Sequence, residues 1–282
     1  MRLYSDSSSL LTFLSQLNPF RAELEARLRT TPQIPVFCAY CNAIHLSSVR
    51  QDESSWVDLR NEFLCESCAM TSRERLLFEA VEKFGGPQDD ARAFIIHERV
   101  TPFFSKLQAR FPEVKGVEYG GPNLEPGVEF PFGGMSVQHE DMQSLSFEDN
   151  SIDLLAHSDV LEHVPDPWKG MREVYRVLKP GGKCVFACPI YSVQDHVQRA
   201  YLDEAGELVF TKGPAYHGDP MREGGVPVFY QFGFFLMDEL REMGFKVSFA
   251  VSHSLLDGYV SNNNPYPEGH MWPFVVVCEK PA

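Results

Sequence analysis

The stretch that decides the fold reads SIDLLAHSDVLEHVPDP at residues 151–167 and continues with RVLKPGG at residues 176–182. Apolar residues at 152 and 154–156 predict a buried strand over residues 152–156. Residues 167–178 then predict a helix, which the Lys-Pro-Gly-Gly segment at 179–182 ends. Residues 183–188 predict the next strand. A strand, a crossover helix and a second strand indicate two parallel strands of one sheet.

The same alternation extends outward along the chain. Thr101-Pro102 starts a helix that runs through residues 103–110, with the threonine as cap. The further predicted strands are residues 93–97, 114–119, 136–139, 245–251 and 274–278, and the further predicted helices are residues 73–84 and 235–243. This order predicts an α/β fold with a doubly wound, mostly parallel sheet.

We expect three parts in the chain. Residues 1–30 have leucines at helical spacing and predict an N-terminal helical arm. Residues 31–84 hold a metal-binding module and a linking helix, and the Gly- and Pro-containing segment at 85–90 marks the boundary. Residues 85–282 form the α/β domain, with an insertion at 189–234 that is rich in Gly, Pro, His and Tyr.

Four of the seven cysteines form two Cys-x-x-Cys pairs, Cys38 with Cys41 and Cys65 with Cys68. Each pair presents two thiolates to one ion, and together they complete the tetrahedral shell of zinc. The loop between the pairs is longer than the usual spacing of about 15–20 residues. Because sulfur fills all four positions, the predicted zinc ion is structural, in a small zinc-ribbon-like module. Disulfides and a redox role are the disfavoured alternatives.

Charge and cysteine content narrow the classes of function. The chain of 282 residues has 25 basic and 39 acidic residues and a net charge of −14. This balance disfavours a nucleic-acid partner, which needs a surface dense in Lys and Arg. No apolar run reaches the length of a transmembrane helix, so we expect no membrane partner. An odd number of cysteines and the absence of an export signal favour a reducing, cytoplasmic location.

The quoted motifs closely resemble those of the class I S-adenosylmethionine-dependent methyltransferases. In that family a hydrophobic fourth strand precedes a segment similar to DVLEHVPDP, and a segment similar to RVLKPGG precedes the fifth strand. The two Cys-x-x-Cys pairs, with VEYGG and YHGDP, resemble a subgroup of bacterial methyltransferase-like proteins that carry a metal module. The resemblance implies a Rossmann-like, seven-stranded sheet and S-adenosylmethionine as cofactor.

The resemblance also implies a set of cofactor-binding positions at the strand ends. Glu118, beside Tyr119, ends the second strand, where the family's carboxylate binds both ribose hydroxyls. Asp141 and Met142 follow the third strand and correspond to the positions that contact the adenine. The positions that end the fourth strand, beside the transferable methyl group, are His157, Ser158 and Asp159.

One motif departs from the family pattern. The first strand leads into His-Glu-Arg-Val-Thr-Pro-Phe at residues 97–103, where the family has a glycine-rich turn. Two interpretations stay open. Glu98 takes the acidic position and the helix that starts at Thr101 faces the methionine carboxylate, or the cofactor site is degenerate and the fold serves another task.

Three residues are the candidates for catalysis: His163, His217 and Asp219. His163 follows Asp159 and Glu162 at helical spacing, so one helical face predicts either a divalent metal site or a capping Asp beside a structural Glu-His pair. His217 and Asp219 lie in the insertion, and they form either an acid/base pair or a hydrogen-bonded turn.

We therefore predict an S-adenosylmethionine-dependent methyltransferase that acts on a small molecule or a carrier-linked metabolite. The alternatives are a non-catalytic binding or interaction module and an enzyme that uses the same fold for a reaction other than methyl transfer. The sequence specifies neither the methyl acceptor nor the oligomeric state.

Overall fold

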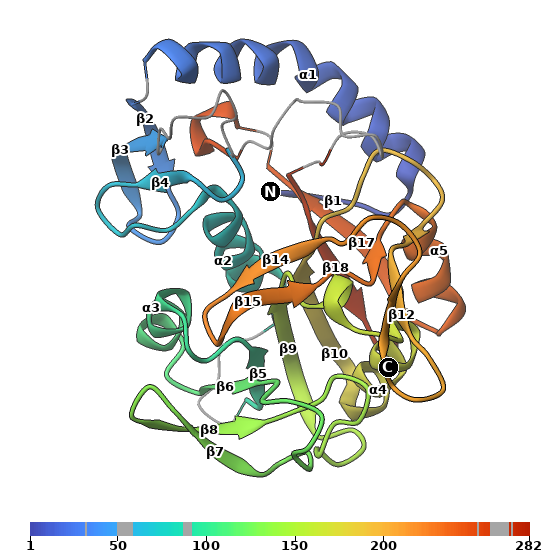
Figure 1. Ribbon diagram of the computed structural model, residues 1–282. Coiled ribbons are helices and arrows are strands. Elements are labelled where there is room, and N and C mark those ends of the chain that lie inside the picture. The colour runs from blue at the N-terminus through green and yellow to red at the C-terminus, as the bar shows by residue number, and fades with distance from the viewer. Residues whose placement is uncertain (32, 50–58, 87–91, 253, 260–270, 272) are drawn as a thin grey trace.

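A computed structural model describes the chain apart from residues 32, 50–58, 87–91, 253, 260–270 and 272. At its centre lies a nine-stranded sheet in the order β1-β17-β18-β10-β9-β5-β6-β8-β7 (Figure 1). In that order the strands are Arg2–Tyr4, Lys246–Val251, Val275–Glu279, Leu178–Ala187, Ile152–Ser158, Phe94–His97, Val114–Glu118, Met135–His139 and Glu129–Phe132.

The central strands of this sheet are parallel. The pairs β8–β6, β6–β5, β5–β9 and β9–β10 all run in the same direction. Strand β18 is antiparallel to both β10 and β17. The prediction of a Rossmann-like, mostly parallel α/β sheet is therefore confirmed, and each of its seven expected strands is present. The sheet is wider than predicted, because β1 and β7 add one antiparallel strand at each edge.

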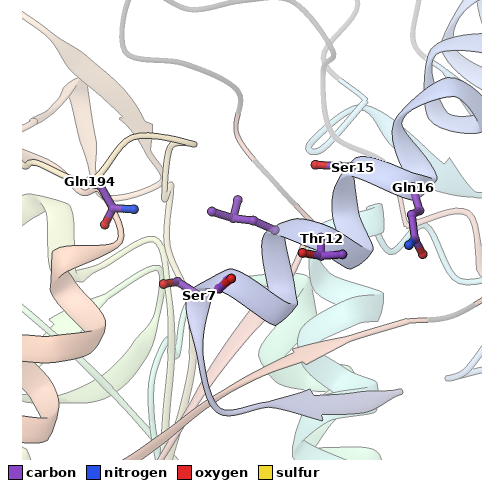
Figure 2. Close-up of a pocket in the computed structure, with 7 residues that line it drawn as sticks. Ser7, Thr12, Ser15, Gln16 and Gln194 are labelled. Atoms are coloured by element: carbon purple, nitrogen blue, oxygen red, sulfur yellow. The ribbon is translucent and has the colours of Figure 1, made fainter.

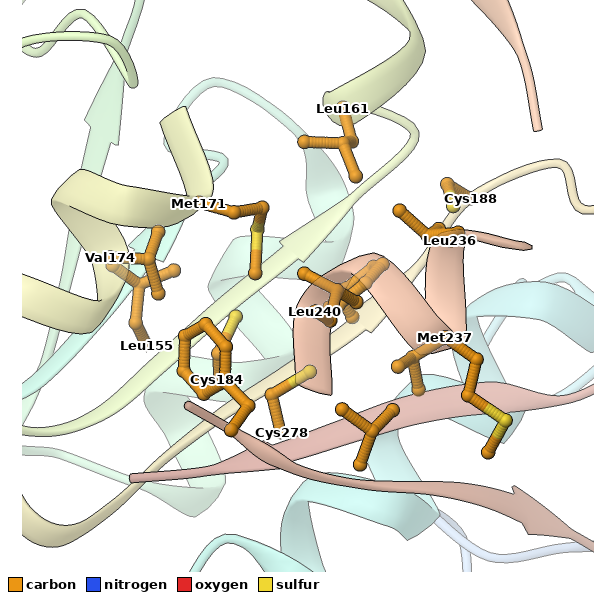
Figure 3. Close-up of a cluster of buried hydrophobic side chains, with 14 of the residues drawn as sticks. Leu155, Leu161, Met171, Val174, Cys184, Cys188, Leu236, Met237, Leu240 and Cys278 are labelled. Atoms are coloured by element: carbon orange, nitrogen blue, oxygen red, sulfur yellow. The ribbon is translucent and has the colours of Figure 1, made fainter. Parts of the chain in front are cut away.

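Helices cover both faces of the sheet (Figure 1). One face packs against α4 (Pro167–Val177), α5 (Phe235–Glu242) and two buried leucines of α1 (Ser7–Thr30). Figure 3 shows this core, in which side chains of α4 and α5 meet Cys184 and Cys278 of β10 and β18. The other face packs against α2 (Ser72–Phe84) and α3 (Pro102–Arg110). This two-sided burial explains the apolar runs within β5, β9 and β10.

The first residues of the chain differ from the prediction of a helical arm over residues 1–30. Arg2–Tyr4 pair with Val251 to Phe249 at the sheet edge, and the helix begins only at Ser7, with Asp6 as its cap. The helix then continues through Pro19 to Thr30. A strand of three residues is too short to produce an alternating pattern, so the sequence gives no local signal for β1.

The first cysteine of each Cys-x-x-Cys pair ends a strand of a three-stranded antiparallel sheet in the order β2-β3-β4, and the second lies in the turn that follows. Its strands are Gln33–Cys38, Ala43–Val49 and Phe63–Cys65. The core beneath this sheet is small: Leu28, Ile34, Val36, Val49, Leu59 and Phe63. So few buried side chains provide little hydrophobic stabilisation, which is the usual reason why such modules need a metal.

Helix α2 belongs to the packing of the large sheet. Leu76, Leu77 and Phe78 of α2 are buried in the same core as Phe94 and Ile96 of β5. The Thr71–Glu74 capping box fixes the start of this helix directly after the second cysteine pair. Most of the expected boundary at residues 85–90 lies outside the described residues, so the division of the chain at that point stays a prediction.

The insertion at 189–234 forms short antiparallel strands. They are β11 (Val197–Gln198), β12 (Ala200–Leu202), β13 (Leu208–Phe210), β14 (Tyr216–Asp219), β15 (Arg222–Pro227) and β16 (Tyr230–Gln231). The β14–β15 hairpin crosses in front of β9 and β10 (Figure 1), and the backbone amide of Phe229, just after it, donates to the Glu162 carbonyl. Among the described helices, none is both long and apolar enough to cross a membrane.

Candidate functional site

The carboxyl ends of β5, β6, β9 and β10 meet at one edge of the sheet. In open α/β sheets ligands bind at this edge, where the strand order reverses. Here the reversal falls between β5 and β9, because the chain continues from β5 to β6 on one side and from β9 to β10 on the other. The sequence-predicted cofactor positions all belong to this edge or to the loops beside it.

The loop from β5 to α3 is held by its own polar side chains. Thr101 caps α3 by accepting a hydrogen bond from the Phe104 amide at 3.3 Å, and its hydroxyl donates to Glu98 at 2.5 Å. Burial raises the pKa of Glu98 to about 7, against the opposing effects of Arg73 and the Thr101 hydroxyl. Glu98 is therefore a carboxyl that changes protonation near neutral pH.

Glu118 ends β6 and reaches across to the same loop. Its Oε1 accepts hydrogen bonds from the backbone amides of Arg99 at 2.7 Å and Val100 at 3.1 Å. Burial raises the pKa of Glu118, and these two amides act in the opposite direction. The loop approaches β6 so closely that a Cβ at Gly116 would lie 2.8 Å from the Glu98 carbonyl oxygen. Gly116, on β6, thus permits the close approach between this strand and the loop after β5.

The predicted adenine side of the site divides into exposed and buried residues. Tyr119 is 41% exposed and packs beside the ring of His139, with ring centroids 5.4 Å apart. Asp141 caps a turn by accepting from the Gln143 amide at 2.8 Å. The side chain of Met142 lies in the core against Gly170 of α4. The contact of Met142 with the adenine stays a prediction.

Two buried histidines lie side by side beneath this edge. His97 of β5 pairs in register with His157 of β9, whose ring stacks on Phe186 of β10 at 4.5 Å. Burial lowers the pKa of His97 to about 4 and that of His157 to about 3. Both rings are neutral at physiological pH, so His157 contributes a flat, uncharged surface beneath the strand ends.

Arginines from the N-terminal part of the chain reach the end of β9. Asp159 follows β9 in the left-handed region, with φ of 52°, and receives two hydrogen bonds from Arg60, at 2.5 and 2.7 Å. Arg73 lies 3.4 Å from the same carboxylate and also donates to the Ser158 hydroxyl. Although burial favours the neutral form, these guanidinium groups hold the pKa of Asp159 well below its usual range. Neither arginine carries a local sequence signal for this contact.

The predicted helical face of Asp159, Glu162 and His163 does not form. The segment after β9 is a single 3-10 turn, η1 (Leu161–His163), and the carboxylate of Asp159 is held by Arg60 instead. In place of Asp159, the side chain of His217 joins Glu162 and His163. The distance is 3.1 Å between His217 Nδ1 and His163 Nε2, and 3.6 Å between His217 Nδ1 and Glu162 Oε1.

An irregularity in the β14–β15 hairpin positions His217. The register shifts between His217 and Asp219, and a Cβ at Gly225 would lie 2.2 Å from the His217 carbonyl oxygen. Such bulges redirect a side chain within a strand pair. Asp219 accepts from the Met221 amide at 2.6 Å and from Arg222 at 3.0 Å. Asp219 therefore forms a hydrogen-bonded turn. The tip of the hairpin contacts Tyr119, because the carbonyl of Tyr119 accepts a hydrogen bond from Arg222.

The four predicted zinc ligands come together. One sulfur atom from each of Cys38, Cys41, Cys65 and Cys68 lies within 4.8 Å of the others. The Cys38 and Cys68 sulfurs are 3.7 Å apart, which matches the roughly 3.7–3.8 Å edge of a tetrahedron with zinc–sulfur bonds of about 2.3 Å. The cluster is compatible with the predicted zinc module.

A surface hollow lies along α1, away from the predicted cofactor positions. Figure 2 shows it along α1, with a volume of about 750 Å³ and Gln194 on its far side. Its lining has hydroxyl and amide groups but no ionisable side chain. A crevice of about 10 Å³ lies between Arg60, Arg73 and Cys188 at the end of β10.

Comparison with known proteins gives a family for the central segment. Residues 103–186 match the sequence model of a family described as "Methyltransferase domain". An "Uncharacterized methyltransferase" of Mycobacterium sp. (strain JLS) is 37% identical over 94 residues, which cover 32% of this chain and 35% of that protein. The "Ubiquinone/menaquinone biosynthesis C-methyltransferase UbiE" of Klebsiella pneumoniae subsp. pneumoniae is 35% identical over 91 residues, 30% of this chain and 36% of that protein. The matches thus span about a third of these relatives.

The solved structures that resemble this chain include a methyltransferase as well. An S-adenosylmethionine-dependent methyltransferase from Mesorhizobium loti superposes with a TM-score of 0.45 at 16% identity, over 73% of this chain and 97% of that one. The matched segment contains β6, β8, β9 and most of β10, which are central strands of the large sheet. Residues 103–186 are therefore similar to methyltransferase domains, and the mostly parallel sheet to which they belong is Rossmann-like.

Proposed function

We propose that this protein transfers a methyl group from S-adenosylmethionine to an acceptor that enters beneath the β14–β15 hairpin. The observation that supports this proposal most strongly is that Glu118, Asp141 and the end of β9 lie at the edge of the sheet where the strand order reverses. The carboxylate of Glu118 fits a hydrogen bond to the cofactor. Both hydrogen bonds recorded at the Glu118 carboxylate among the described residues end on Oε1, so Oε2 is available to accept from a ribose hydroxyl.

The residues divide into holding and reacting groups. Glu118 and Asp141 would hold the ribose and adenine ends, while Tyr119 covers the outer side of the site. His157 forms an uncharged floor, and Ser158 and Asp159 face the methyl end. Glu98 and Thr101 fix the loop against which the methionine end would lie. When bound, S-adenosylmethionine supplies an electrophilic methyl group, whose bond to sulfur breaks as a lone pair of the acceptor attacks it.

The acceptor must lose a proton when it is a hydroxyl or an amine. His163, on the turn that follows β9, and His217, on the β14–β15 hairpin, are the candidate bases for an acceptor that lies between them and the methyl group. The pKa of His217 is raised, because the nearby carboxylates of Glu162 and Asp159 outweigh the effect of burial. Because the chain is acidic, we propose a small or carrier-linked acceptor and not a nucleic acid.

We also propose that the Cys38–Cys41–Cys65–Cys68 cluster binds structural zinc. Arg60 lies between the two cysteine pairs in the sequence, and its guanidinium group binds Asp159 at the end of β9. An ordered module is therefore needed to keep Arg60 in place. Zinc would act on the methyl-transfer site indirectly, by ordering the segment that carries this arginine.

A second candidate function is a binding module without methyl transfer. The small crevice at the end of β10 and the glycine-free loop after β5 favour it. Calorimetry of the full chain with S-adenosylmethionine and with its demethylated product separates the two. The methyltransferase proposal predicts one site with micromolar affinity that Glu118→Gln weakens. Absence of binding at high micromolar ligand would leave the binding-module function.

A further inference from the structure

Three potential metal ligands from two distant segments meet above the end of β9. Glu162 and His163 come from η1, and His217 comes from β14. The three ligand atoms are Glu162 Oε1, His163 Nε2 and His217 Nδ1. Their mutual distances are 3.1, 3.6 and 3.7 Å. This cluster is separate from the four cysteines.

These distances match those of a bound metal ion. Nitrogen and oxygen ligands lie about 2.0–2.1 Å from zinc, so adjacent ligand atoms in a tetrahedral site are roughly 3.3–3.4 Å apart. The three observed distances surround that value. The histidine nitrogens are also close enough for a direct hydrogen bond, so the distances alone do not select an ion.

The buried carboxylate of Glu162 supplies an independent indication. Glu162 is 1% exposed, and among the described residues neither of its carboxylate oxygens has a hydrogen-bond partner. A buried carboxylate without donors loses its hydration without compensation, which disfavours its ionised form. The side chains that face it are His163 and His217, at 3.7 and 3.6 Å. A cation between these three groups would stabilise the ionised form.

The proton on His163 lies on the side away from the cluster. Its Nδ1 is 2.7 Å from the Pro227 carbonyl oxygen, which can only accept a hydrogen bond. Nδ1 therefore carries the proton, and Nε2 presents a lone pair toward Glu162 and His217. A hydrogen bond from the second ring nitrogen to a carbonyl is the usual orienting contact of a metal-binding histidine.

We propose that Glu162, His163 and His217 bind a divalent transition-metal ion of the zinc class. Two imidazole nitrogens and one carboxylate oxygen suit such an ion better than Mg²⁺ or Ca²⁺, which prefer oxygen ligands. Three protein ligands leave a coordination position open, as in catalytic zinc sites. Within the proposed methyltransferase function, on which this role rests, that position would orient an acceptor oxygen or nitrogen at the end of β9.

The test measures the ion directly, on the full chain. Protein is loaded with ZnCl₂ and dialysed, and its zinc content is measured. The wild type is expected to hold about two ions per chain, and His217→Ala and Glu162→Gln about one, with the cysteine site filled. Competition with a chelator should show that these substitutions lower the zinc affinity of the Glu162–His163–His217 site. The loss should exceed the roughly 10–100-fold that follows when a metal ligand loses its own hydrogen-bond partner.

Glu223→Gln is the matched control, because Glu223 is an exposed carboxylate on the same hairpin. It should keep both ions. The proposal is overturned if the wild type holds a single ion, or if the second ion survives both ligand substitutions. Glu162→Gln preserves side-chain size, and His217 is partly exposed, so at least one variant should fold. If the wild type binds a second ion but does not bind S-adenosylmethionine, the methyltransferase function is rejected and the metal-site proposal stands.

Discussion

The contact between Arg60 and Asp159 provides the sharpest test of how the cysteine module is joined to the sheet. Arg60 donates to both oxygens of Asp159, and the two side chains are 11% and 21% exposed. Removing one partner of a fully buried ion pair costs about 3–5 kcal/mol, whereas an exposed pair contributes at most about 1 kcal/mol. Since Arg73 remains near Asp159 at 3.4 Å, we expect Arg60→Met to cost about 1–3 kcal/mol.

A double-mutant cycle isolates the contact. Arg60→Met, Asp159→Asn and the double variant are unfolded in urea, followed by circular dichroism. We expect an interaction energy of about 1–2 kcal/mol between the two positions. For 282 residues, an average unfolding entropy near 0.6 kcal/mol per kelvin converts 2 kcal/mol into a fall in Tm of about 3 °C.

The control is Arg110→Met, which removes an ion pair to Glu82 with a 51% exposed arginine, and it should cost less than about 1 kcal/mol. Because the pKa of Asp159 is lowered in the folded state, the stabilisation is present above about pH 4 and is lost as the carboxylate protonates in acid. The reasoning is refuted if the substitutions at positions 60 and 159 are additive within about 0.3 kcal/mol.

The other predictions concern the cofactor site, the zinc module and Glu98. Glu118→Gln keeps the acceptor for the Arg99 and Val100 amides but removes the charge, so calorimetry should show S-adenosylmethionine affinity about 10–100-fold lower; unchanged affinity in a folded protein would remove the ribose assignment. Cys38→Ser should release zinc, measured by metal analysis, and lower Tm; a retained full equivalent would reject the four-cysteine site. Because the pKa of Glu98 is raised to about 7, its neutral form favours folding at low pH, and this contribution is lost as pH rises from about 5 to 8. The stability of the wild type relative to Glu98→Gln should fall over that range in urea titrations, and a constant difference would show that Glu98 stays ionised.

Strands β5, β9 and β10 were predictable because each contains a short apolar run, at residues 94–96, 154–156 and 184–187. The proximity of the four cysteines was also predicted correctly, since each Cys-x-x-Cys pair is a local motif with a known metal-binding geometry. It gave no signal for β7, where Pro131 lies within the strand. Proline is tolerated there because β7 is an edge strand, and whether a strand lies at an edge depends on the whole sheet.

The contacts that complete the site were not predictable because they join distant segments. Arg60 and Asp159 are far apart in the sequence, as are His163 and His217, and no local pattern selects these partners. The sequence did identify Asp159, Glu162 and His163, but it assigned them to one helical face. The positive φ of Asp159 breaks that face, directs its carboxylate to Arg60 and leaves the third position to the hairpin.

The central claim is that S-adenosylmethionine binds at the carboxyl ends of the parallel strands. The most direct measurement is ultraviolet cross-linking of methyl-labelled S-adenosylmethionine to the full chain, followed by mapping of the labelled peptide. The account predicts a saturable label, displaced by the demethylated product, in peptides that contain Tyr119 or residues 139–142. Label confined to other peptides, or label that does not saturate, would contradict it.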